Sequence, residues 1–162
     1  MHLFLVLIQP QWKLILFKDD TVYNTNMINI VIDTNVLLSA IFSDRGASYK
    51  LLSIIDSKKF VVNISTTLLY EYEEILKLKS KLGISYVDAI LDYICLIGKK
   101  NSIFYLWRPK LKDVDDDFLL ELAVKSNSII VTLNGKDFKP ASEFGLKVMT
   151  PKEFLQHIGE IS

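Results

Sequence analysis

Short runs of β-branched residues alternate with amphipathic stretches over most of this 162-residue chain. The apolar runs predict five buried strands, at Ile28–Ile32, Phe60–Ile64, Ser102–Leu106, Ile129–Thr132 and Lys147–Met149. Helical spacing between them predicts helices at Asp33–Phe42, Ala47–Ser57, Ser65–Lys79, Ser85–Gly98 and Asp115–Ser126, and a last helix after Thr150. Strands that alternate with helices form a mostly parallel sheet covered on both faces, so the predicted fold class is α/β.

Three local signals mark the ends of these helices. Thr150-Pro-Lys-Glu153 is a capping box with proline at the first helical position. Ser85, with Asp88 three residues on, predicts a weaker capping box. Asn127 is predicted to end its helix in a left-handed conformation.

The first 26 residues differ from the rest and divide the chain into an extension, 1–26, and one domain, 27–162. The apolar run His2–Ile8 is too short to cross a bilayer, and it lacks the basic start and small-residue cleavage site of a signal peptide. We therefore expect a cytoplasmic protein with no membrane partner. A strand pair that includes Trp12–Phe17 and a start codon assigned too far upstream are both open readings of the extension, to which we assign no catalytic role.

Composition excludes several kinds of active site. The chain has one cysteine, Cys95, and two histidines, His2 and His157. An intrachain disulfide and a cysteine-rich zinc site are therefore impossible, and a histidine-based site is disfavoured. Its six glycines form no dinucleotide or nucleotide-triphosphate loop. Nineteen acidic side chains balance nineteen basic ones, which argues against a generally basic nucleic-acid coat but not against a nuclease. Carboxylates are the catalytic groups that remain in quantity.

Acidic or amide side chains from four segments are predicted to meet at the carboxyl ends of the strands. They are Asp33 after the first strand, Glu71 in a helix, the group Asp113, Asp115, Asp116 and Asp117 before another helix, and Asn134 with Asp137 after the fourth strand. Each alone is more commonly a cap, a turn former or part of a solvated face. Together they would repel one another unless protons or a cation neutralise them, and oxygen ligands favour Mg²⁺ or Mn²⁺. Such an ion suits phosphoryl transfer or hydrolysis.

The same segments resemble the motifs of the PIN-domain family, most closely the group that forms the toxins of toxin–antitoxin pairs. The matching segments, in order, are Ile30–Ala40 (IVIDTNVLLSA), Ser65–Leu76 (STTLLYEYEEIL), Lys112–Ala123 (KDVDDDFLLELA), Ile129–Phe138 (IIVTLNGKDF) and Val148–Leu155 (VMTPKEFL). The resemblance covers about residues 27–157. It implies a three-layer α/β/α fold with a central parallel sheet of about five strands, and a Mg²⁺- or Mn²⁺-dependent ribonuclease.

The resemblance also implies roles for individual residues. Asp33 and Asp116 would be the main metal ligands, and Glu71 would bind through water or orient the attacking water. The fourth motif departs from the family, because Asn134 stands where many members have aspartate; Asp137, with Asn134, would then support a second ion or the leaving group. Side chains that could hydrogen-bond the ligating carboxylates are Thr34, Asn35, Ser39 and Thr132.

The remaining expectations concern partners. Basic side chains near the predicted crevice could contact RNA phosphates: Arg45, Lys110, Lys112, Lys136 and Lys139. The resemblance implies a cognate antitoxin, and a homodimer formed through helices between Ala47 and Lys79. Two alternatives stay open. One is a catalytically weak or inactive PIN scaffold that binds RNA or protein, which Asn134 favours. The other is a haloacid-dehalogenase-type phosphatase, which Asp33-Thr-Asn35 disfavours.

Overall fold

A computed structural model of the chain describes residues 26–103 and 116–162. Five parallel strands form one sheet in the order β3-β2-β1-β4-β5. Their bounds are β1 Ile28–Ile32, β2 Phe60–Ile64, β3 Lys99–Lys100, β4 Ile129–Val131 and β5 Val148–Met149. Strands β1 and β2 have the bounds predicted from the sequence. The predicted mostly parallel sheet is therefore confirmed.

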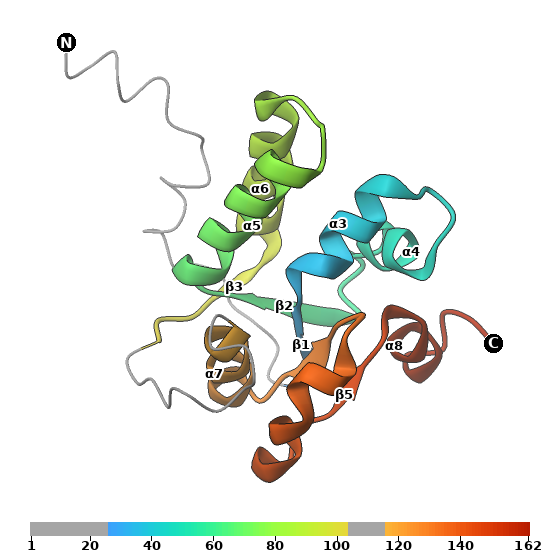
Figure 1. Cartoon of the computed structure of the whole chain (residues 1–162). Helices are drawn as coiled ribbons and strands as arrows, with labels where there is room; N and C mark the ends of the chain where they lie inside the picture. The colour runs from blue at the N-terminus through green and yellow to red at the C-terminus, as the bar shows by residue number, and fades with distance from the viewer. Residues whose placement is uncertain (1–25, 104–115) are drawn as a thin grey trace.

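Helices pack on both sides of this sheet and complete a three-layer α/β/α arrangement. They are α3 Thr34–Phe42, α4 Ala47–Ser53, α5 Thr66–Lys79, α6 Ile84–Ile97, α7 Asp117–Ser126 and α8 Pro151–His157, with the 3₁₀ segment η2 at Gly135–Phe144. Helix α7 lies on the opposite side of the sheet from α3 and α4 (Figure 1). The chain moves from β1 outward to β3 and then returns past β1 to β4, so its direction reverses next to β1. In open α/β sheets, this reversal is where ligands bind.

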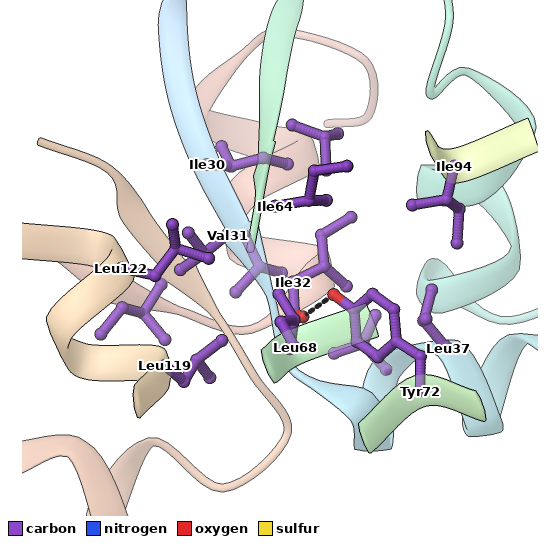
Figure 2. Packing of buried hydrophobic residues seen from close by; sticks show 14 of the residues in the cluster. Ile30, Val31, Ile32, Leu37, Ile64, Leu68, Tyr72, Ile94, Leu119 and Leu122 are labelled. Atoms are coloured by element: carbon purple, nitrogen blue, oxygen red, sulfur yellow. Dashed lines mark hydrogen bonds between the residues drawn. The ribbon is translucent and has the colours of Figure 1, made fainter. Parts of the chain in front are cut away.

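The core is built from the strands and the inward faces of the helices. Ile30, Val31 and Ile32 of β1 are almost fully buried between the helical layers. Figure 2 shows β1 between α7 residues Leu119 and Leu122 on one side and Tyr72 on the other. Cys95 is also fully buried, as expected of a packing residue.

Two capping predictions are confirmed and a third is wrong. Thr150 and Glu153 form the full capping box at α8, and Asn127 ends α7 with φ 49°. Helix α6, however, begins at Ile84 with Gly83 as its N-cap, and no side chain caps it. The weak Ser85–Asp88 signal therefore does not start this helix.

The third strand was predicted too late in the chain. It is Lys99–Lys100, directly after α6, whereas Ser102 and Ile103 are not strand and residues 104–106 lie outside the described part. The turn from helix to strand is tight at Gly98, where a Cβ atom would lie 2.8 Å from the Ile94 carbonyl oxygen. Lys99 and Lys100 pair with β2 directly after Gly98. The strand therefore begins before the apolar run Ser102–Leu106, from which it had been predicted.

Other element boundaries differ in smaller ways. Helix α4 ends at Ser53 rather than Ser57, and α7 begins at Asp117 rather than Asp115. The segment η2 was not predicted, because Pro140 and its mixed composition hide a helical pattern. The strand pair expected in the extension falls outside the described residues. Over residues 26–103 and 116–162, no helix has the length and apolar character needed to cross a membrane.

Candidate active site

Asp33 occupies the end of β1, at the place where the strand order reverses. Its backbone N–H donates to the Val131 carbonyl of β4 at 2.9 Å, and α3 starts at the next residue. Asp33 is the N-cap residue of α3 and is only 8% exposed. Its Oδ2 atom accepts hydrogen bonds from Thr132 Oγ1 at 2.6 Å and from Asn35 Nδ2 at 2.8 Å. The carboxylate is thus fixed in position between β1 and β4.

Burial and hydrogen bonding act in opposite directions on this carboxyl group. Removal from water raises the pKa of Asp33, and the bonds from Thr132, Asn35 and the adjacent backbone N–H groups offset only part of that rise. The ionised form is therefore costly in the protein alone. A cation beside the carboxylate would lower this cost.

Glu71 reaches the same place from α5. Ser65 caps this helix by accepting from the Leu68 N–H at 3.2 Å, and the Thr34 hydroxyl donates to Glu71 Oε1. The neighbouring Tyr72 is buried, and its hydroxyl donates to the Ile32 carbonyl at the end of β1 (Figure 2). These contacts hold α5 in one rotational setting against β1. They set Glu71 next to the residues that follow the strand.

The negative charges of the site affect the pKa of the neighbouring Tyr72. Burial raises its pKa well above the usual value, and the negative charges of Asp33 and Glu71 raise it further. The phenol therefore stays protonated at neutral pH. It remains a hydrogen-bond donor to β1.

The other two acidic motifs reach the site from α7 and from the segment after β4. Asp116 immediately precedes α7 and makes no side-chain capping bond there. The backbone N–H of Asn134 donates to Thr132 Oγ1 at 3.0 Å, and the N–H of Asp137 donates to the Asn134 carbonyl at 3.0 Å. Thr132 thus links this segment to Asp33.

A cleft of about 730 Å³ brings the predicted residues together. Its lining includes all five members of the predicted metal set: Asp33, Glu71, Asp116, Asn134 and Asp137. Thr34 and Asn35, which the sequence predicted as supporting residues, also line the cleft. Seven further lining residues were not predicted from the sequence: Leu38, Thr67, Tyr70, Glu74, Ile75, Lys79 and Phe118. Six of these seven are on α3 or α5. Periodicity could have found the α5 members, because they lie three, four or eight positions from Glu71 or from one another.

The described lining is strongly acidic. It contains five carboxyl groups and a single cation, Lys79. Two carboxylates about 4 Å apart repel by roughly 4 kcal/mol at an effective dielectric near 20. Such a cleft repels the phosphates of a nucleic acid unless cations enter it.

Oxygen atoms dominate the donors that the cleft offers, and hard oxygen donors suit Mg²⁺ and Mn²⁺. The donor chemistry therefore fits the predicted ions. Across the described ranges, however, no three histidine, cysteine or acidic side chains are gathered in the arrangement of a metal centre.

The supporting residues divide into two groups. Thr34 donates a hydrogen bond to Glu71, whereas Asn35 and Thr132 both donate to Asp33, and Asn35 also donates to Thr132. Ser39 is half-buried on α3 and does not line the cleft. Asp117, in the same acidic run as Asp116, is 2% exposed and does not line the cleft.

Three of the predicted RNA-contacting residues are described by the structure, and none of the three lines the cleft. Arg45 is exposed, with its Nε atom 3.8 Å from Asp44. Lys136 and Lys139 are exposed beyond Asn134. The other two RNA-contacting candidates, Lys110 and Lys112, lie outside the described residues, as do Asp113 and Asp115 of the predicted acidic run.

Comparison with known proteins agrees with these features. A family model described as the PIN domain matches residues 29–136, which include Asp33, Glu71, Asp116 and Asn134. An uncharacterized protein of Methanocaldococcus jannaschii is 32% identical over 145 residues. That alignment covers 80% of this chain and 90% of the relative.

Proposed function

Because this chain belongs to the PIN domain family, whose members are generally nucleases, we propose that it is a Mg²⁺- or Mn²⁺-dependent endoribonuclease. The observation that supports this most is the acidic cleft, in which Asp33, Glu71, Asp116 and Asp137 arrive from four separate segments. Phosphodiester hydrolysis needs groups that position water and balance negative charge. The cleft supplies those groups at the sheet edge where α/β proteins bind ligands.

Each acidic residue of the cleft would have a separate role in hydrolysis. Asp33 and Asp116 hold the ion, which when bound activates water and stabilises charge on the phosphate. Glu71, fixed by the Thr34 hydroxyl, orients the attacking water. Asp137, with the Asn134 amide oxygen, supports the leaving-group side. Attack by water needs no 2′-hydroxyl, so preference for RNA comes from the cleft and not from the chemistry.

Cleavage of a mixed pool of labelled RNAs by the purified full-length protein tests this function. We expect cleavage with Mn²⁺ or Mg²⁺ and none with EDTA. Equal cleavage in EDTA would contradict a metal-dependent centre. Metal-independent binding of RNA without turnover would instead identify a binding module.

That second candidate function is favoured by one residue, Asn134. It places an uncharged amide in the cleft at the position where many PIN proteins carry aspartate. A weaker metal position would lower turnover and leave the cleft able to bind RNA or a protein. Turnover by the wild-type protein excludes this alternative.

We further propose that the enzyme is the toxin of a cytoplasmic toxin–antitoxin pair, acting as a homodimer and silenced by a cognate antitoxin. The similarity of its motifs to the toxin group supports this role. Controlled expression in a bacterial host provides the test. We expect growth arrest from the wild type and not from Asp33→Asn at equal protein level; equal growth of both cultures would argue against a toxin.

A further inference from the structure

Asn134 and Gly135 form the one Asn-Gly pair in the sequence, and the pair lies between β4 and η2. Both residues are exposed, and Asn134 lines the acidic cleft. Asparagine is a thermolabile residue, because its side-chain amide carbon can be attacked by the backbone nitrogen of the next residue. A following glycine favours this attack, since it has no Cβ atom to obstruct the approach. A chemically reactive dipeptide therefore stands in the lining of the cleft.

The two reacting groups of this pair are not held by hydrogen bonds within the described part of the chain. In residues 26–103 and 116–162, the Asn134 side-chain amide has no hydrogen-bond partner and does not cap η2. The Gly135 N–H also has none, as is usual for the first N–H groups of a helical segment. The Asn134 carbonyl accepts from the Asp137 N–H at 3.0 Å. Ring closure requires rotation about the Cα–C bond of Asn134, which among the described hydrogen bonds breaks only this one.

From this arrangement we propose that Asn134 is a deamidation site, at which the chain itself converts an amide of the cleft into a carboxylate. The Gly135 nitrogen gives its proton to water or hydroxide and forms a bond to Cγ of Asn134. The side-chain nitrogen takes up a proton and leaves as ammonia, which closes a five-membered imide. Water then opens this ring at one of its two carbonyl carbons. Opening at Cγ gives aspartate, and opening at the main-chain carbonyl carbon gives isoaspartate, in which the backbone runs through Cγ.

Both products add a carboxyl group to the five that already line the described cleft. The aspartate product keeps the backbone and the hydrogen bond from the Asp137 N–H to the carbonyl of residue 134. The isoaspartate product lengthens the backbone by one carbon atom and turns that carbonyl into the free carboxylate, so the start of η2 loosens. The effect of the new charge on metal-dependent cleavage rests on the proposed ribonuclease function, whereas the modification itself does not.

The modification is measured on the folded, full-length protein in mildly alkaline buffer with EDTA. Peptide mass spectrometry detects the small gain in mass when –NH₂ is replaced by –OH, and a parallel sample unfolded in guanidinium chloride gives the rate without the fold. We expect Asn134 to be converted in the folded protein within days. If Asn134 keeps its amide in the folded protein while most of the unfolded chain is converted, the fold protects this residue and the proposal is wrong.

Another asparagine of the same chain serves as an internal control. Asn127 is also exposed, but the residue after it is Ser128, whose N–H is held by the Ala123 carbonyl at 2.9 Å. We expect Asn127 to keep its amide while Asn134 is converted. Conversion of both residues at the same rate would overturn the proposal, because it would show that neither the glycine nor the free N–H matters.

Gly135→Ala provides the matched variant. An alanine Cβ at this position would lie 3.6 Å from Val148 Cγ1, an ordinary van der Waals contact, so the fold accommodates it. The added methyl group obstructs the attacking nitrogen, and we expect conversion of Asn134 to slow severalfold. Equal conversion in the wild type and in Gly135→Ala would contradict attack by the nitrogen of residue 135.

The same aged samples separate this proposal from the ribonuclease function. Ion exchange resolves the converted protein, which carries one more negative charge, and its aspartate form is expected to respond to Mn²⁺ in RNA cleavage as Asn134→Asp does. Conversion at Asn134 without RNA cleavage by any sample supports the modification and overturns the ribonuclease function. Metal-dependent cleavage by folded protein that never converts at Asn134 overturns the modification alone.

Discussion

At the scale of single residues, Asp33 combines a proposed catalytic role with a cost to stability. Burial raises its pKa above the ordinary value of 3.8, so the folded protein holds this proton to higher pH than the unfolded chain does. The free energy of unfolding therefore falls as pH rises from about 4 through the raised pKa. At neutral pH the ionised group destabilises the metal-free protein.

Asp33→Asn is consequently expected to stabilise the metal-free protein at about pH 7 while abolishing cleavage. The amide keeps an oxygen for Thr132 and Asn35 but carries no buried charge. Urea unfolding in EDTA measures the effect, and the gain is expected to shrink toward pH 4, where the wild-type carboxyl is protonated. A variant less stable than the wild type at both pH values would show that the hydrogen bonds of Asp33, and not its desolvation, determine its contribution to the free energy of unfolding.

Asn134 provides a second prediction at this scale. Asn134→Asp adds a carboxylate to the cleft beside Asp137 and is expected to lower the Mn²⁺ concentration needed for half-maximal cleavage by severalfold. The same charge adds to the repulsion in the metal-free protein, so its stability in EDTA is expected to fall. Asn134→Ala serves as the control; if the aspartate variant responds to Mn²⁺ as the alanine variant does, residue 134 is not a metal position.

At the scale of elements, the contact between α5 and β1 positions Glu71. Tyr72→Phe removes the hydroxyl that donates to the buried Ile32 carbonyl, and we expect a loss of about 1–3 kcal/mol in the free energy of unfolding. Chemical denaturation measures this loss. Cleavage is expected to fall as well, through kcat, because α5 carries Glu71. Full activity at full stability would show that this bond does not set the position of α5.

The elements show which parts of the fold the sequence could predict. Strong local signals specified β1, β2, α5 and the capping box of α8, because burial pattern and capping chemistry agree there. The position of β3 depended on a tertiary contact at Gly98, and η2 has no periodic pattern. A buried asparagine in β2, Asn63, was part of the predicted strand, but its network with Asn29, Asn101 and Ser128 could be seen only in the fold.

The candidate site, like the fold, could be predicted only in part from the sequence. Motif resemblance identified four of the five acidic residues that line the cleft, since each of the four lies in or beside a recognisable strand or helix signal, and it missed Glu74. The run of three aspartates at 115–117 does not itself show which carboxyl faces the cleft; in the structure Asp116 lines it and Asp117 is buried elsewhere. Tyr70 and Lys79 carry no motif of their own, so their place emerged only once α5 was set against β1.

At the scale of the whole molecule, ion binding is coupled to folding. A ligand that binds only the folded state stabilises it by about 2.7 kcal/mol at one hundred times its Kd. We expect Mn²⁺ to raise the Tm of the wild type and to have little effect on Asp33→Asn or Asp116→Asn. Calorimetric scans with and without Mn²⁺ check this, and an equal rise in all three proteins would indicate binding outside the acidic cleft.

Whether the acidic cleft is the nuclease centre can be tested by the cleavage rate of labelled RNA in Mn²⁺ for four full-length proteins: the wild type, Asp33→Asn, Asp116→Asn and Asp44→Asn. Asp44 is an exposed acid in the turn after α3 and does not line the cleft. We predict that both cleft variants lose at least about a hundredfold in rate, more than supporting residues around a metal usually contribute, while Asp44→Asn cleaves like the wild type. Wild-type rates in both cleft variants would contradict the assignment of this acidic cleft as the nuclease centre.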